Sequence, residues 1–335
     1  MIDRALVVGL GSIGRRHLRL LREVLPEADI RVLRHTGCNG PIKGADGCFE
    51  KLETACEFRP DLAVIASPAP FHLPVASALA RAGAHLMVEK PVSDSAAGVA
   101  ELLALCAAEG RQLQVGYNLR FLDTLQRFRA ELTAGTIGTV RLVRCEIGQY
   151  LPDWRPDVDY RGAVSARRDL GGGVLLELSH EVDMLRWVFG EVAWLSCWIG
   201  RLGLLEIDVE DSAALNFGFV EGPVAQLSMD FLRRDAKRVC TAIGDDGTLV
   251  WDAMAGRVAR FDPGTGAWAD LFVVPPERDT TYLAQLHALL AAISTSRSDA
   301  IAAQGADGLA VLRLVEAAMA SDADAGRRIA IGDRA

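Results

Sequence analysis

A glycine-rich turn directly behind a short apolar run is the sequence feature that most constrains the fold of this chain. Residues 5–8 read Ala-Leu-Val-Val, and residues 9–14 form a G-x-G-x-x-G run that opens a helical pattern over 12–25. At such a turn the glycines let the backbone approach a pyrophosphate bound at the helix N-terminus. A plain strand-to-helix turn is the alternative. The run predicts a dinucleotide site formed by Gly9, Gly11, Ser12, Ile13 and Gly14.

Short apolar runs alternate with helical patterns as far as residue 117. Further runs lie at 29–33, 62–66, 85–88 and 113–115, and helical patterns lie near 71–82 and 94–109. Continuous apolar strands separated by amphipathic helices are typical of a parallel sheet covered on both faces. Residues 1–117 are therefore predicted to form an α/β domain, a Rossmann dinucleotide-binding domain.

The pattern changes after residue 117. A helical pattern at 121–134 leads to an apolar run at 140–147, and strand-like runs joined by tight turns fill much of 192–274. Such turns indicate a predominantly antiparallel sheet. Helical patterns at 280–295 and 303–320 close the chain. We therefore expect residues 118–335 to form a C-terminal α+β domain with an open sheet, used for substrate binding and oligomerisation.

Length and charge narrow the classes of partner. A chain of 335 residues exceeds what one core usually holds, which favours two domains. Its 36 basic and 44 acidic residues give a net charge of −8, and the arginines are scattered, so nucleic acid is not expected as a partner. Without an apolar stretch near 18 residues or room for a cleavable signal, we expect a soluble, cytoplasmic protein and no membrane partner.

The cysteines and histidines lack the spacing of a metal or disulfide framework. The seven cysteines are odd in number and contain no C-x-x-C pair, so we expect mostly buried thiols rather than disulfides or a zinc site. The six histidines include no H-x-x-x-H or H-E-x-x-H pattern, so no metal is expected.

The residue that selects between NAD and NADP is expected after the second apolar run. About twenty residues beyond Gly14, where an NAD site often has an acid, the chain has Arg34. Arg34 is able to pair with a 2'-phosphate, assisted by His35 and Thr36, which favours NADP. In the alternative, Arg34 stacks on the adenine and NAD is accepted too.

Three further stretches complete a family resemblance. They are Ser67-Pro68 with His72, the tripeptide Glu89-Lys90-Pro91, and residues 116–121, which include Asn118 and Arg120. Together with the glycine turn, they resemble the glucose-fructose oxidoreductase, inositol dehydrogenase and MocA family along essentially the whole chain. The resemblance implies a Rossmann domain, a second domain with an open sheet, and NAD(P)-linked oxidation or reduction of sugars, cyclitols and related carbonyl compounds. It also implies cofactor contacts from Ser67, Pro68, His72, Glu89, Lys90 and Asn118, and substrate contacts from Asn118 and Arg120.

Lys90 follows a predicted parallel strand, at the carboxyl edge where such sheets bind ligands. A lysine there is able to hold a substrate hydroxyl and to stabilise a developing alkoxide. The resemblance implies that Lys90 is catalytic and binds substrate. A surface lysine in a strand-to-helix loop is the alternative.

A second catalytic candidate lies in the helical pattern after residue 173. At 100° per residue, Glu177, His180 and Met184 share the side opposite an apolar stripe. The resemblance implies that His180, in its His-x-x-Asp setting, is a catalytic acid or base; a structural or exposed histidine is the alternative. Many relatives have an Asp four residues before the histidine, but this chain has Leu176, so Glu177 is the candidate to orient His180 or bind a hydroxyl.

The polar segment 151–172 is the remaining candidate for substrate contacts. It brings together Trp154, Tyr160 and Arg161, a mixture that suits the hydroxyls and C–H faces of a polyol. An interface for oligomerisation is the alternative. We also expect a homodimer or homotetramer, because the sheet of the second domain has too few helices to cover an apolar open face.

The motifs together predict an NAD(P)-dependent oxidoreductase that acts on a CH–OH group of a sugar, a sugar derivative, a nucleotide-sugar or a cyclitol. His180 or Lys90 would handle the hydroxyl proton while the other polarises the oxygen. A non-catalytic dinucleotide-binding regulator would need only the glycine turn. Reduction of an imine or a tetrapyrrole, or elimination chemistry with bound NAD, remains open on the same fold.

Overall fold

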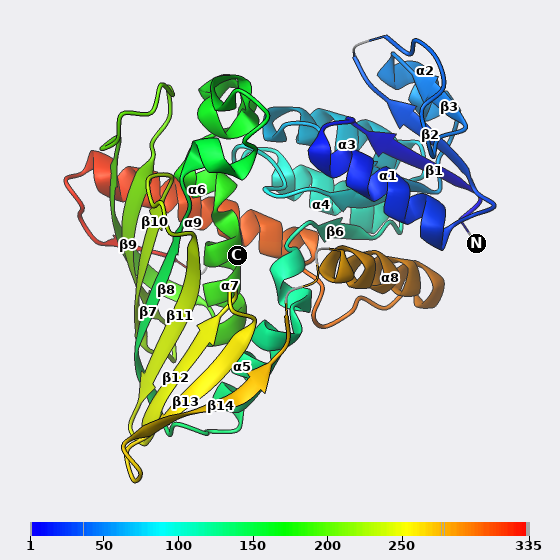
Figure 1. Ribbon diagram of the computed structural model, residues 1–335. Helices are drawn as coiled ribbons and strands as arrows, with labels where there is room; N and C mark the ends of the chain where they lie inside the picture. The colour runs from blue at the N-terminus through cyan, green and yellow to red at the C-terminus, as the bar shows by residue number, and fades with distance from the viewer. Residues whose placement is uncertain (1, 36, 276, 278, 333–335) are drawn as a thin grey trace. The chain divides into compact units, whose positions relative to one another are not determined.

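The computed structural model describes residues 2–35, 37–275, 277 and 279–332, which form two compact units (Figure 1). The first unit comprises Met1–Asn118 and Asp279–Leu312, and the second comprises Leu119–Arg278 and Arg313–Ala335. The predicted division at residue 117 therefore differs from the structure at one point. A segment near the C-terminus, 279–312, packs with the N-terminal sheet.

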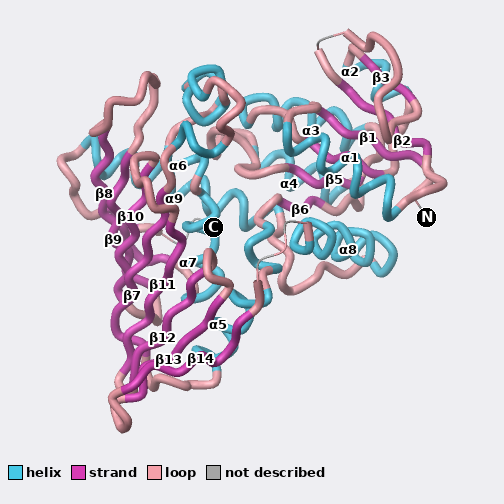
Figure 2. Tube along the Cα trace, in the orientation of Figure 1, coloured by secondary structure: helices cyan, strands magenta, loops and turns pink. Residues whose placement is uncertain are grey.

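The first unit contains a six-stranded parallel sheet in the order β3-β2-β1-β4-β5-β6 (Figure 2). Its strands are β1 (Arg4–Val8), β2 (Asp29–Leu33), β3 (Gly47–Phe49), β4 (Leu62–Ile65), β5 (His85–Val88) and β6 (Leu113–Val115). Its helices are α1 (Ser12–Val24), α2 (Leu52–Glu57), α3 (His72–Arg81), α4 (Val99–Ala108) and α8 (Thr280–Thr295), and α9 (Gly305–Ala323) begins in this unit. The predicted Rossmann fold is confirmed.

The strand order creates a switch point beside β1. The chain builds outward from β1 to β2 and β3, then returns to place β4 on the other side of β1. In open α/β sheets, ligands bind beyond the carboxyl ends of the strands at such a reversal. The glycine run leaves β1 at this point.

Helix α8 completes the core of the first unit. Leu286 and Leu289 are buried in one apolar cluster with Val7 of β1, Ile30 of β2 and Leu21 of α1. The helix itself is predicted by its apolar spacing. The surface on which α8 packs is not predicted, because an apolar stripe on a helix shows only that one of its faces must be buried.

The second unit contains a nine-stranded sheet in the order β14-β13-β12-β11-β7-β10-β9-β8-β15. Its strands are β7 (Val140–Gly148), β8 (Val192–Gly200), β9 (Ser212–Phe219), β10 (Val224–Asp230), β11 (Lys237–Gly244), β12 (Gly247–Asp252), β13 (Arg257–Asp262), β14 (Ala267–Val273) and β15 (Ile329–Ala330). The pairing is antiparallel except between β7 and β10. The predicted predominantly antiparallel sheet is confirmed.

Helices cover one face of this sheet. Helix α5 (Asp123–Thr133) contacts β12, β13 and β14, and the short helix α6 (Val174–Glu177) contacts β9 and β10. Helix α7 (Ser179–Phe189) is tied to β11 by an ion pair between Glu181 and Arg238. The end of α9 reaches β8, where the Ser321 hydroxyl accepts the Cys197 N–H at 2.8 Å.

The opposite face of the sheet carries polar side chains where an apolar surface was expected. Arg144, Asn216, Gln226 and Thr241 stand on paired positions of β7, β9, β10 and β11 and line a hollow of about 480 Å³. Apolar side chains such as Leu227 alternate with them and face the helices.

The predicted continuous helix after residue 173 is also corrected. The chain forms α6 and α7 with a break at Leu178, whose φ and ψ are −98° and 23°. Met184, expected beside His180, is buried, whereas Glu177 and His180 are half-buried. Because the break resets the helical phase, residues on its two sides do not share the single face that a 100° wheel gives them.

The cysteines differ from the prediction at one pair. Cys38 and Cys48 are joined by a disulfide with their Cα atoms 5.7 Å apart, whereas Cys56, Cys106, Cys145, Cys197 and Cys240 are free thiols. Four of these five are buried, as expected. Among the described helices, none has the length and hydropathy needed to span a bilayer.

Candidate functional site

The glycine turn forms a cradle at the carboxyl end of β1. Gly9 has a φ of +85°, and a Cβ there would lie 2.9 Å from the carbonyl oxygen of Ala66. A Cβ on Gly14 would collide with the Gly9 carbonyl, whereas one on Gly11 would point into open space. Helix α1 begins at the next residue, and its N-cap, Gly11, provides no side-chain capping hydrogen bond. The first backbone N–H groups of α1 therefore remain available for an anion.

Ser67 supplies a second feature of the cradle. Its hydroxyl oxygen is buried and has no hydrogen-bond partner among the described residues, and its backbone N lies 3.0 Å from where a Gly9 Cβ would stand. A buried hydroxyl without a partner costs free energy unless a ligand satisfies it. The open glycine, the uncapped helix and this hydroxyl fit the pyrophosphate and ribose of a dinucleotide.

Arg34 and His35 lie at the end of β2. The Arg34 N–H donates to the Phe49 carbonyl of β3 at 3.0 Å, and the Arg34 side chain is half-buried. His35 is exposed, and Thr36 lies outside the described residues. Arg34 thus occupies the predicted place beyond β2, and its preference for NADP stays a prediction.

A buried pair supports the backbone at Lys90. Nε2 of His17, on α1, lies 2.6 Å from a carboxylate oxygen of Glu89, and both side chains are buried. The other carboxylate oxygen of Glu89 accepts the Lys90 N–H at 3.2 Å. A Cβ on Gly116 would lie 2.8 Å from that oxygen, so the glycine gives the carboxylate its space. The tripeptide is therefore anchored to the helix that begins at the glycine turn.

The charge state of Glu89 follows from these contacts. Burial raises the pKa of Glu89, but the hydrogen bond and charge of His17, with Lys90 and its N–H, outweigh burial and hold the pKa below its ordinary value. Glu89 is consequently a buried carboxylate with hydrogen-bonded oxygens. Removing either His17 or the Lys90 N–H would leave a carboxylate oxygen of Glu89 buried without a partner, which costs free energy.

His72 joins the carboxyl ends of β4 and β5. Its Nε2 lies 2.6 Å from the Ser67 carbonyl oxygen and its Nδ1 lies 2.9 Å from the Pro91 carbonyl oxygen. Burial lowers the pKa of His72, opposed by these two carbonyls and by Glu89. His72 is buried, and its predicted contact with the cofactor, like those of Ser67 and Pro68, stays a prediction.

Asn118 forms a hydrogen bond with a residue of α8, 163 positions later in the sequence. Its amide nitrogen donates to the Thr281 hydroxyl at 2.8 Å at the start of α8, and both residues are buried in the first unit. The predicted contacts of Asn118 with cofactor and substrate stay predictions.

In the second unit, Arg120 forms a buried ion pair. Its Nε and one terminal nitrogen lie 2.9 and 2.5 Å from the two carboxylate oxygens of Asp183 on α7, and its guanidinium lies 5.9 Å from the Trp187 ring centre. Arg120 was predicted to bind substrate. The structure commits two of its donors to Asp183, so any substrate contact must come from what remains.

His180 and Glu177 stand on opposite sides of the helix break. His180 lies in the first turn of α7 and is half-buried, and a carboxylate oxygen of Glu177 accepts the Ser165 hydroxyl at 2.9 Å. Lys90 belongs to the first unit and His180 to the second. The pairing of these two groups on one substrate atom stays a prediction.

The predicted substrate loop is a series of short 3-10 turns. The Trp154 ring N–H donates to the Gln149 carbonyl at 3.1 Å, and the Tyr160 hydroxyl accepts the Glu206 N–H at 3.2 Å. Arg161 is exposed and pairs with Asp159 and Glu206. The loop therefore holds Trp154 and Tyr160 by hydrogen bonds to backbone groups, and the Arg161 guanidinium is already paired with two carboxylates.

One supporting residue, His17, was missed from the sequence. His17 follows Gly14 by three residues, and hence lies on the same side of α1, which is the available signal. Asp183, the acid of the His-x-x-Asp setting, was considered, but its role was left open. The pairing of either residue across 72 or 63 positions has no local signature.

Two family models match the chain. The model described as "Oxidoreductase family, NAD-binding Rossmann fold" matches residues 4–117, and that described as "GFO/IDH/MocA C-terminal domain" matches residues 125–250. The chain belongs to the Gfo/Idh/MocA oxidoreductase family. The predicted resemblance is confirmed, and the glycine cradle and the Glu89-Lys90-Pro91 tripeptide lie within the matched Rossmann part.

Individual Gfo/Idh/MocA members are distant relatives. The rhizopine catabolism protein MocA of Rhizobium meliloti is 25% identical over 93% of this chain and 92% of its own length. The uncharacterized oxidoreductase YrbE of Bacillus subtilis is 27% identical over 65% of this chain, a match that spans 64% of YrbE. A structure of levoglucosan dehydrogenase with NADH and levoglucosan superposes with a TM-score of 0.84 at 17% identity, covering 98% of this chain and 99% of that one.

Proposed function

We propose that this family member is an NAD(P)-dependent dehydrogenase or reductase acting on a CH–OH group of a sugar, a sugar derivative or a cyclitol. The observation that carries the proposal is the assembly of the glycine cradle, the partnerless Ser67 hydroxyl and the anchored Lys90 at one carboxyl edge of the first sheet. A non-catalytic dinucleotide-binding regulator would need the glycine cradle. It would not need a buried carboxylate that fixes the backbone of Lys90.

The residues of the chain divide the work as follows. The N–H groups of α1 and the Ser67 hydroxyl hold the dinucleotide, whose nicotinamide supplies or accepts the hydride. Glu89 fixes the backbone of Lys90, and the Lys90 ammonium holds the substrate oxygen and stabilises negative charge on it. His180 accepts the hydroxyl proton during oxidation and returns it during reduction. With the roles exchanged, the neutral amine of Lys90 accepts the proton and His180 donates a hydrogen bond to the substrate oxygen.

NADP is the proposed preferred cofactor. Arg34 replaces the acid that selects free ribose hydroxyls, and its side chain is half-buried beyond β2. A guanidinium in that place is suited to bidentate contact with a 2'-phosphate. The levoglucosan dehydrogenase structure contains NADH, so both cofactors belong in every assay.

The proposed substrate class is a polyol. Trp154 and Tyr160 offer ring faces, and Glu177 offers a carboxylate for a hydroxyl. Levoglucosan, a sugar derivative, is the compound bound in the solved relative. Nucleotide-sugars belong to the same proposal because they carry the same ring chemistry.

We also propose that the protein is a homodimer or homotetramer. The helix-free face of the second sheet exposes Trp198 and Val224 beside the polar hollow, and ordinary protein interfaces combine polar and apolar surface in this way. Segment 151–172 is the other surface available for an interface. Light scattering at micromolar concentration tests the proposal, and a mass of 36 kDa would contradict it.

A screen of sugars, sugar acids, nucleotide-sugars and cyclitols with NAD and NADP tests the activity. Reduction of the nicotinamide is followed by its absorbance, and the reverse direction is run with the matching ketoses. Turnover with at least one polyol supports the proposal. Tight binding of a dinucleotide without turnover of any CH–OH or carbonyl compound would identify a regulator instead.

A further inference from the structure

The seven cysteines of this chain differ in burial and bonding: four are buried free thiols, two form a disulfide, and Cys56 is a half-buried free thiol. Cys106, Cys145, Cys197 and Cys240 are buried free thiols, and burial raises the pKa of Cys106 to about 11. Cys38 and Cys48 are half-exposed and joined by a disulfide, with a sequence separation of 10. Buried thiols are inert, whereas accessible disulfides exchange with small thiols. Mild reductant therefore has one target bond among the described residues.

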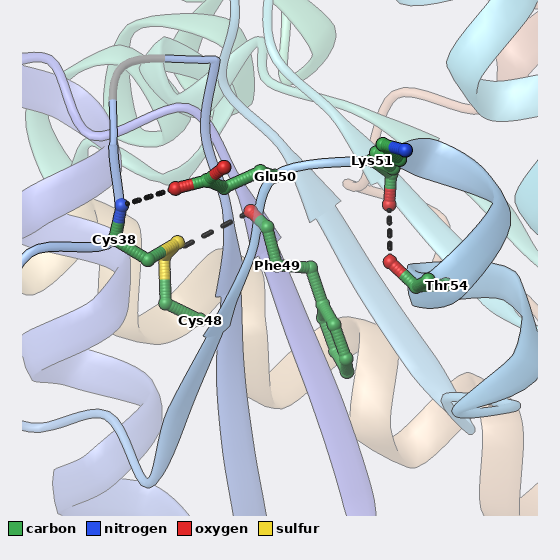
Figure 3. The surroundings of a disulfide bond; sticks show 6 residues. All are labelled: Cys38, Cys48, Phe49, Glu50, Lys51 and Thr54. Atoms are coloured by element: carbon green, nitrogen blue, oxygen red, sulfur yellow. Dashed lines mark hydrogen bonds between the residues drawn. A yellow bond between two sulfur atoms is a disulfide. The ribbon is translucent and has the colours of Figure 1, made fainter.

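This disulfide lies beside the proposed adenosine end of the cofactor site. Figure 3 shows the bond together with Phe49 and Glu50. Cys48 is in β3, opposite Val32 of β2, and the next pair in register is Phe49 with Leu33. Arg34 follows directly, and its N–H donates to the Phe49 carbonyl. The disulfide therefore joins β3 to Cys38, four residues beyond Arg34.

The two ends of the segment after Arg34 are held differently. At the far end, Asp46 exchanges hydrogen bonds with Ile30, and its carboxylate pairs with Arg22. At the near end, Cys38 is held by the disulfide and by its N–H, which donates to a Glu50 carboxylate oxygen at 2.8 Å. Opening the disulfide leaves the β2–β3 pairing intact. It removes the covalent tether of Cys38 and leaves this end held by two hydrogen bonds, from the Cys38 N–H to Glu50 and from the Arg34 N–H to Phe49, so the Arg34 and His35 side chains sample more conformations.

We propose that Cys38–Cys48 is a thiol-sensitive crosslink that sets affinity for the adenosine half of the dinucleotide. With the bond closed, Arg34 and His35 are preorganised for the adenosine ribose and its 2'-phosphate. With the bond open, the same residues must be ordered during binding, which weakens it. This inference rests on the proposed cofactor site beside Arg34.

The chemistry is a reversible thiol–disulfide exchange. A thiolate of a small dithiol attacks one sulfur, so the Cys38–Cys48 bond breaks and a mixed disulfide forms with that cysteine. The second thiolate of the reductant then attacks the reductant's own sulfur in the mixed disulfide, closes the reductant's disulfide and releases the cysteine as a thiolate. Two electrons pass to the protein, and the two protons of the reductant end on the cysteine sulfurs. A small disulfide oxidant reverses each step.

The test compares oxidised and dithiol-reduced protein for binding of three probes. These are NADP, adenosine 2',5'-bisphosphate and nicotinamide mononucleotide, measured by calorimetry, with the thiol state counted by alkylation and mass spectrometry. Reduction is expected to weaken the two adenosine-containing probes by ~5- to 10-fold and to leave nicotinamide mononucleotide unchanged. A Cys38→Ser/Cys48→Ser variant should bind like the reduced protein under either condition.

Cys56→Ser is the matched control, because Cys56 is a half-buried free thiol in the same unit. It should keep the full response to reductant. If Cys38→Ser/Cys48→Ser does not fold, reduced wild-type protein and Cys38→Ser alone supply the comparison. Equal adenosine bisphosphate affinity before and after reduction overturns the inference while leaving the proposed function intact. If oxidised protein binds no dinucleotide, the proposed function fails and the inference fails with it.

Discussion

His17 on α1 and Glu89 at the end of β5 meet in a buried pair, with Nε2 of the imidazole 2.6 Å from the carboxylate. The ring of Tyr282, on α8, packs edge-on against the His17 imidazole at 5.8 Å between centres. His17 thus links three elements through two contacts: its own helix α1, the end of β5 before Lys90, and helix α8.

The His17→Leu substitution should destabilise the protein by about 3 kcal/mol or more, because it leaves the Glu89 carboxylate buried without its partner. His17→Gln, which keeps a donor, should lose less. Arg19→Leu is the control on the same helix: its ion pair with Asp279 is half-exposed and should contribute about 1 kcal/mol or less. Urea unfolding measures all three. Similar losses for His17→Leu and Arg19→Leu would contradict a special role of the pair.

Acid should weaken the protein through Glu89. The pKa of Glu89 in the fold is below its ordinary value, so its contribution to stability is present above the pKa of the unfolded chain and is lost as the pH falls through the folded pKa. We expect the melting temperature of wild type to fall more steeply than that of Glu89→Gln below about pH 4. Parallel curves would show that Glu89 is not responsible for the acid sensitivity.

Lys90→Met and His180→Asn should each lower turnover by ~10²-fold or more while cofactor affinity stays within a few fold. The reason is that both groups are proposed to act on the substrate oxygen rather than on the dinucleotide. The comparison requires steady-state rates beside calorimetric cofactor binding. Retention of most activity in His180→Asn would remove the second unit's helix α7 from the proposed chemistry and direct attention to Tyr160 or Asp183.

Arg34→Ala should weaken NADP binding by about tenfold or more and NAD binding much less, because it removes a charge-assisted contact to the 2'-phosphate. Lys43→Ala serves as the control, since Lys43 is an exposed cation in the same loop. Titration of each variant with both cofactors gives the ratio of its NADP affinity to its NAD affinity. If Arg34→Ala lowers both affinities equally, the guanidinium stacks on the adenine instead.

The sequence predicted those parts of the fold that show a regular pattern of apolar residues over a short stretch. The apolar runs at 29–33 and 85–88 coincide with β2 and β5, and the alternation behind them gives the parallel sheet. Strand β3, with three half-buried residues, was missed because it is too short to show a period. The break at Leu178 was missed because apolar spacing continues through it.

The candidate site likewise has parts that the sequence predicted and parts that it did not. The glycine turn and the tripeptide at Lys90 were predictable, because each is contiguous in sequence and lies at a strand end. The partners that hold them were not, because His17 reaches Glu89, and Asn118 reaches Thr281, only after the sheet has assembled. The disulfide was rejected on an odd cysteine count, an argument about frameworks that is silent on a single pair.

The placement of α8 has a consequence for synthesis of the protein. Leu286 and Leu289 belong to the same cluster as Val7 and Ile30, so the N-terminal sheet emerges from the ribosome long before the residues that fill its core. At ordinary translation rates the interval is on the order of ten seconds. During that time the nascent sheet exposes an apolar surface that a chaperone must shield or the following residues must cover. Transplanting residues 1–118 alone into a chimera would reproduce this incomplete intermediate permanently.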